Sequence, residues 1–181
     1  MLTTLTIIAV IIAIAIAAIL IFAATKPDVL SVQRSISIKA PPEKILAAIN
    51  DFHRWRSWSP YEEKDPGMER IYSGNNAGKG AIYQWNGSKN VGSGRMEILD
   101  TTPSKTTIKL DFFTPFEGHN TAEFKALPRR DATTLVTNLT WAMQGPSPFM
   151  SKMMQVFINM DRMIGKDFET GLANLKDLAE A

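Results

Sequence analysis

The chain starts with a long apolar segment. Ile7–Ala24 is an unbroken run of eighteen apolar residues, and no charged side chain occurs before Lys26. As a helix, residues 2–25 would be about 36 Å long at about 1.5 Å per residue, against a hydrocarbon core of about 30 Å. A cleaved signal peptide is the alternative, but no basic residue precedes the run and no A-x-A motif immediately precedes Lys26. The pattern predicts a transmembrane anchor over residues 1–25 and a tether over residues 26–30.

Beyond the tether, the pattern predicts one strand and two short helices. Val32–Ile38 alternates between apolar and polar side chains, as a β-strand does. The segment Ala40-Pro41-Pro42-Glu43 is typical of a helix start, because proline is tolerated in the first turn and an acidic residue favours the positive end of the helix dipole. An apolar stripe from Ile45 to Ile49 continues this helix, and a second short helix is predicted over Phe52–Trp58.

From residue 68 to residue 144 the apolar period shortens to two, which predicts a sheet. The turns between the alternating segments are rich in Gly, Pro and Asn and too short for crossover helices, so neighbouring strands should be antiparallel. The predicted strands are Glu69–Ser73, Ala81–Trp85, Gly94–Asp100, Thr106–Phe113, Thr121–Leu127 and Thr133–Met143, and residues 128–131 are predicted as a turn. Apolar residues from Ile108 to Phe112 alternate with charged ones, which predicts one covered face and one solvated face.

The last segment is predicted as one long helix over Phe149–Ala179. Its apolar stripe, at helical spacing, consists of Phe157, Ile164, Phe168, Leu172 and Leu175. Asp161 falls on or beside this stripe, where a carboxylate needs a partner or a raised pKa. Three interpretations remain open for it: an ion pair with Arg162, Lys166 or Arg95, a polar contact to a ligand headgroup, or acid–base catalysis.

Composition and charge exclude several kinds of chemistry. A net charge of +2 gives little reason to expect nucleic-acid binding, and the absence of cysteine excludes disulfides, thiol catalysis and cysteine-bound metals. The only histidines, His53 and His119, belong to no HExxH motif, and there is no GxSxG motif, so no metal, cofactor or catalytic residue is expected. Because Lys and Arg occur only after the apolar segment, the domain is expected on the cytoplasmic side of the membrane.

The order of strand, two short helices, six strands and long helix resembles the helix-grip fold of the START-like (SRPBCC) superfamily. Three sequence segments are similar to those of its polyketide cyclase/dehydrase and lipid-transport branch, including membrane-tethered bacterial members. They are SISIKAPPEKILAAINDFHRWRSWSP, GAIYQWNGSKNVGSGRMEI and MDRMIGKDFETGLANLKDLAE. The resemblance covers about residues 31–180 and implies an α+β domain over residues 31–181, with an antiparallel sheet curled around a long C-terminal helix. It also implies a cavity between sheet and helix for an apolar or amphipathic small molecule.

Aromatic residues gather where that cavity is expected. Trp55 and Trp58 share a helix face, and Tyr83 and Trp85 share a strand face. The candidate ligand-binding residues are Trp55, Trp58, Tyr83, Trp85, Phe112, Phe124, Trp141, Met154, Phe157 and Asp161. The alternative is that the apolar members of this set only fill the core.

We therefore expect a membrane-tethered binding domain for a hydrophobic or amphipathic small molecule, with a lipid as one candidate. A polyketide-cyclase-like enzyme and a co-chaperone-like protein-interaction domain are the alternatives. The sequence identifies no protein partner and no particular ligand.

Overall fold

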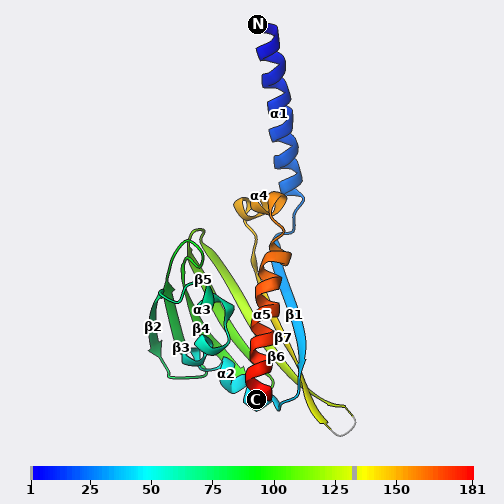
Figure 1. The fold of residues 1–181 in the computed structure, drawn as a ribbon. Helices are drawn as coiled ribbons and strands as arrows, with labels where there is room; N and C mark the ends of the chain where they lie inside the picture. Colours follow the sequence, from blue (N-terminus) through cyan, green and yellow to red (C-terminus); the bar gives the residue numbers. More distant parts are fainter. Residues whose placement is uncertain (1, 132–133) are drawn as a thin grey trace.

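The computed structural model describes residues 2–131 and 134–181. Within these residues, the helix α1 (Leu2–Ala24) is long and apolar enough to cross a membrane, a description that an N-terminal signal sequence also meets. It projects away from the folded part of the chain (Figure 1).

In the described residues, seven strands form one antiparallel sheet in the order β1-β7-β6-β5-β4-β3-β2. The strands are β1 (Val29–Ile38), β2 (Glu69–Gly74), β3 (Ala81–Asn86), β4 (Ser93–Thr102), β5 (Lys105–Thr114), β6 (Gly118–Asp131) and β7 (Thr134–Pro146). The predicted α+β class and the antiparallel sheet with a C-terminal helix are confirmed. Because β1 pairs with β7, the first and last strands of the domain are neighbours.

The hairpin of β6 and β7 is longer than predicted. Residues 128–131 were expected to form a turn, but Pro128 lies in β6 and pairs with Thr137 of β7. The neighbouring strand β5 pairs with β6 as far as Lys105–Lys125, and the Ala126 N–H still donates to the Ser104 carbonyl at 2.8 Å, so the free edge of β6 begins after Ala126. A proline is tolerated there because no ladder bond needs its missing N–H. Thr133, the predicted start of the last strand, lies outside the described residues.

Three short helices, rather than the two predicted, connect β1 and β2. They are α2 (Pro42–Ile49), the 3₁₀ helix η1 (Phe52–Ser57) and α3 (Pro60–Lys64). The prediction ended the second helix at the Ser59-Pro60 pair, yet these residues start a new helix in which Pro60 occupies the first turn. The spacing Ser59-x-x-Glu62 matches a capping box in the sequence, but in the structure Ser59 makes no side-chain cap bond.

The single long C-terminal helix predicted over Phe149–Ala179 is wrong. The structure has two helices, α4 (Phe149–Phe157) and α5 (Met160–Glu180). Ile158 is extended, with φ −122° and ψ 126°, and the Asn159 side chain accepts a bond from the Arg162 backbone N–H at 2.9 Å. This bond caps a new helix at Asn159, so α4 and α5 do not share one apolar stripe.

The antiparallel order gives the sheet two distinct ends. At the start of β1, Val29 lies opposite Pro146, the last residue of β7. The β5–β6 turn (residues 115–117) and the β3–β4 turn (residues 87–92) fall at this same end, which we call the α1 end. The β2–β3 turn and α2 lie at the opposite end, which we call the far end (Figure 1).

Candidate ligand-binding site

The face of the sheet that α5 contacts, called here the inner face, carries a cluster of aromatic side chains. The rings of Trp58 and Trp141 are 5.7 Å apart, those of Phe124 and Trp141 are 4.9 Å apart, and those of Trp55 and Trp58 are 4.7 Å apart. Phe168 of α5 stacks on Trp141 at 4.0 Å with an interplanar angle of 8°. Trp55, Trp58, Phe124 and Trp141 are each at most 4% exposed, so the structure brings these four candidates into one closely packed group.

The indole N–H of Trp141, unlike those of Trp55 and Trp58, has no hydrogen-bond partner in the described part of the chain. The indole N–H of Trp55 donates to the Ile49 carbonyl at 2.9 Å, and that of Trp58 donates to the Ala48 carbonyl at 3.4 Å. In the described part of the chain, Trp141 Nε1 is the only buried side-chain nitrogen or oxygen without a hydrogen-bond partner. A buried donor left unpaired costs about 1–3 kcal/mol, so this position favours any molecule that brings an acceptor to it.

Toward the α1 end, the aromatic side chains are less enclosed. Tyr83 is buried and its ring lies 6.1 Å from that of Trp85, which in turn lies 5.8 Å from Phe112. Trp85, Phe112 and Leu110 are only half-buried. The ring of Trp85 lies against Gly94, where a side chain would overlap it. The inner face is therefore closed near the far end and partly open near the α1 end.

A buried cluster of three polar side chains, Glu62, Arg70 and Tyr83, lies beside these rings. It was not predicted from the sequence. Glu62 of α3 accepts from the Tyr83 hydroxyl at 2.7 Å and from Arg70 Nε at 2.7 Å. The Arg70 guanidinium also donates to the Met68 carbonyl at 2.5 Å. Burial raises the pKa of Tyr83, and the bond to Glu62 raises it further, so the phenol stays protonated. Both carboxylate oxygens of Glu62 are occupied, and the group joins α3 to β2 and β3.

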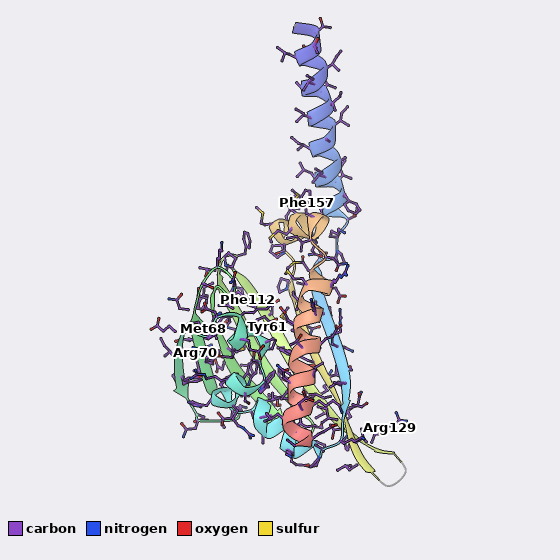
Figure 2. All side chains as sticks on the ribbon, viewed as in Figure 1. Tyr61, Met68, Arg70, Phe112, Arg129 and Phe157 are labelled. Atoms are coloured by element: carbon purple, nitrogen blue, oxygen red, sulfur yellow. The ribbon has the colours of Figure 1, made fainter. Side chains whose placement is uncertain are left out.

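Met154, Phe157 and Asp161 lie away from the aromatic cluster. Phe157 is 70% exposed on α4, and Met154 is half-buried on the same helix. Figure 2 shows Phe157 beside the lower end of α1 and Phe112 on the sheet below it. These positions follow from the break at residue 158, because the stripe expected to carry Phe157 toward the sheet ends there.

Asp161 forms an ion pair, but not with the partners that were expected. Its Oδ2 lies 3.0 Å from Arg34 Nη2 of β1, and Arg34 Nε lies 2.8 Å from Glu169 Oε1. The Arg34 guanidinium holds the pKa of Asp161 below its usual range. Gly165 lies between the two carboxylates along α5, and a methyl group there would overlap the guanidinium. The absence of a side chain at position 165 lets Arg34 cross the helix.

Hollows also lie outside the aromatic cluster. One, of about 190 Å³, lies at the far end and is lined by residues that include His53, Tyr72 and Asn75. His53 stacks on Tyr72 at 4.1 Å, and its Nδ1 lies 3.1 Å from Asp51 Oδ1. Another, of about 470 Å³, lies between residues 26–31 and residues 155–161. The described residues contain no group of three or more His, Cys, Asp or Glu side chains placed to hold a metal ion.

An antiparallel sheet with an aromatic inner face and a C-terminal helix across it defines a helix-grip domain of the START-like type. The chain belongs to the polyketide cyclase / dehydrase and lipid transport family, whose profile matches residues 29–180. The family resemblance predicted from the sequence is therefore confirmed. No curated protein sequence matches the chain.

Solved structures share the fold at low sequence identity. A protein of Chromobacterium violaceum has a TM-score of 0.57 and 15% identity, covering 86% of this chain and 99% of its own. A protein of Nitrosospira multiformis has a TM-score of 0.58 and 17% identity, covering 83% of this chain and 96% of its own. The di-domain ARO/CYC StfQ from the steffimycin biosynthetic pathway has a TM-score of 0.57 and 10% identity, covering 84% of this chain and 51% of its own. At these identities, the likeness concerns the fold alone.

Proposed function

We propose that the protein is a membrane-anchored binding domain, over residues 31–181, for an apolar or amphipathic small molecule held between the inner face and α5. The observation that carries this proposal is the unpaired indole N–H of Trp141 within an otherwise apolar aromatic cluster. Ligand sites are mostly apolar with a few polar groups that fix orientation, and this donor is such a group. The family's description as polyketide cyclase / dehydrase and lipid transport supports the same class of ligand.

The ligand enters from the α1 end, where Trp85, Leu110 and Phe112 are half-buried. Two methionines, Met96 and Met143, are the next residues along the inner face, paired by register with Leu110 and Ala122. Methionine side chains change shape easily, so they can move aside for an apolar chain. The acceptor group of the ligand then reaches Trp141, while its apolar part contacts the half-buried rings.

The anchor is α1, and it keeps the domain beside lipid-dissolved ligand. No charged residue interrupts it, and its apolar length matches a hydrocarbon core of about 30 Å. Lys26 lies two residues after the end of α1, with its ammonium 4.5 Å from the centre of the Phe22 ring, a placement suited to a membrane interface. We place the domain on the cytoplasmic side, because basic residues occur only after the apolar segment.

Mass spectrometry of organic extracts from the full-length protein in mild detergent tests the proposal. Leu110→Trp fills the half-buried region, and Leu99→Trp, at a position 41% exposed on β4, is the matched control. All three proteins keep α1, so lipid bound around the anchor is the same in each. We expect a compound that accompanies the wild type and Leu99→Trp and falls several-fold in Leu110→Trp. Equal extracts from all three proteins would contradict the proposal.

A further inference from the structure

The helix α4 has its polar and apolar sides reversed relative to a surface helix of a soluble domain. Its polar residues share one side of the helix, because Ser151 and Lys152 lie four and three positions before Gln155. This side faces the protein: Lys152 is ion-paired with Asp28, and Gln155 Nε2 donates to Ser147 Oγ at 2.7 Å.

The apolar side of α4 faces outward. Phe149 is 50% exposed, Met150 is 63% exposed and Phe157 is 70% exposed. The other apolar residues of α4, Met153, Met154 and Val156, are half-buried, and no residue of α4 is buried. A helix in water gains stability by burying its apolar stripe. Only an apolar environment outside the chain gives this arrangement a comparable gain.

The position of α4 identifies that environment. α4 contacts α1, and the covered side of α1 holds Ile19, which is half-buried, and Ala23, which is fully buried. The apolar segment of α1 continues to Ala24, so α4 touches α1 within its last two turns. Figure 1 shows α4 beside the lower end of α1. With α1 as the membrane anchor, α4 lies at the depth of the bilayer surface.

A second apolar point lies at the same end of the sheet. The β5–β6 turn carries Phe116, which is 54% exposed. The antiparallel order places this turn at the α1 end, as it does the end of β7 from which α4 continues. The turn and α4 thus present apolar side chains on the same side of the domain.

We propose that α4 and the β5–β6 turn form a second membrane contact, which holds the α1 end of the domain against the bilayer surface. The apolar side of α4 inserts among the acyl chains to a depth of about 5–10 Å, as interfacial amphipathic helices do. The half-buried residues Trp85, Leu110 and Phe112 then face the lipid from which the ligand comes. This inference rests on the proposed function, because it takes α1 as the membrane anchor.

Spin-label depth measurements test the contact directly, because the chain has no cysteine and each introduced cysteine is unique. Full-length variants Met150→Cys, Phe157→Cys and Phe116→Cys are reconstituted in vesicles of equal parts phosphatidylcholine and phosphatidylglycerol. Ala77→Cys, exposed in the β2–β3 turn at the far end, is the water control, and Ile12→Cys in α1 is the lipid control. Collision rates with oxygen, which prefers lipid, and with a water-soluble nickel complex are measured at each position. Thermal unfolding confirms that each labelled chain is folded.

We expect the ratio of oxygen to nickel collisions at positions 150, 157 and 116 to exceed that at position 77 several-fold. Ratios at 150 and 157 equal to that at 77, with position 12 in lipid, would overturn the second contact and leave the anchor intact. Lipid-like ratios at 150 and 157 with a water-like ratio at 116 would overturn the part played by the turn. A water-like ratio at position 12 would overturn the anchor, and the inference with it.

Discussion

The neighbouring helices α4 and α5 are both amphipathic, yet they use their apolar sides in opposite ways. α5 buries Phe168, Leu172 and Leu175 against the sheet, whereas charged residues on its other side, such as Arg162, Lys166 and Asp177, are exposed. α4 turns its polar side to the protein and leaves Phe149 and Phe157 exposed. The comparison shows that periodicity predicts where a helix has an apolar side, while its place in the fold decides what covers that side.

Substitutions on the apolar sides of α5 and α4 should differ most in how far they lower the free energy of unfolding. Phe168→Ala removes a ring that stacks on Trp141 and is 2% exposed, so we expect it to lower the free energy of unfolding by about 3–5 kcal/mol. Phe157→Ala changes a ring that is 70% exposed, and its effect in detergent should stay within about 0.5 kcal/mol. Chemical denaturation of both variants in one detergent makes the measurement. Similar losses for the two would show that α4 is packed as α5 is.

A smaller loss of stability is expected at α3, which the buried Glu62 carboxylate joins to β3 through Tyr83 and to β2 through Arg70. Tyr83→Phe removes the hydroxyl that donates to the buried Glu62, and hydrogen bonds to charged groups contribute about 1.5–3 kcal/mol. Tyr72→Phe is the matched control, because the Tyr72 ring lies 5.2 Å from that of Tyr83, whereas the bonds to the Glu62 carboxylate come from Tyr83 and Arg70. Thermal unfolding should separate the two variants. If both lose equal stability, the bond to Glu62 does not hold α3.

The smallest effect concerns the ion pair that joins α5 to β1. The bond from Arg34 lowers the pKa of Asp161 below its ordinary value of 3.8. A carboxyl group whose pKa is lowered by folding stabilises the protein above its ordinary pKa, and this stabilisation is lost as the pH falls through the lowered pKa. We expect Asp161→Asn to lower the unfolding temperature slightly at neutral pH, because the carboxylate is largely exposed.

The gap between wild type and Asp161→Asn should close as the pH falls below 3.8, the ordinary pKa of the carboxyl group. Asp177→Asn, on the exposed side of α5, is the control and should differ from wild type by little at any pH. A gap for Asp161→Asn that persists unchanged in acid would show that the charge of Asp161 is not what stabilises the contact.

Local patterns predicted the fold well, because each strand and helix carries its own period. The strand from Thr106 to Phe113 alternates so regularly that its inner and outer faces are evident from the sequence alone. Periodicity does not predict the helix break, because Asn159, a good cap, lies within a segment that is otherwise helical in period. The sequence signal for the break is Asn159 itself, because asparagine is favoured as the N-cap of a helix.

Contacts between distant segments could not be predicted in the same way. Arg34 and Asp161 are 127 positions apart, and their pairing depends on Gly165 and on the placement of α5 over β1. Glu62, Arg70 and Tyr83 meet only because α3 lies against β2 and β3. For the candidate site, the sequence indicated which residues are aromatic, but not which rings close the far end and which stay half-buried.

The central claim is that the half-buried part of the inner face holds a small apolar or amphipathic molecule. Photo-crosslinking in native membranes tests this claim most directly. Benzoylphenylalanine replaces Phe112, on the inner face of β5, in the full-length protein. The same residue replaces Lys109, on the outer face of β5, as the control. We predict that the protein labelled at 112 gains the mass of a lipid-sized compound on irradiation, whereas the protein labelled at 109 does not. The same adduct at both positions, or none at 112, would contradict the account.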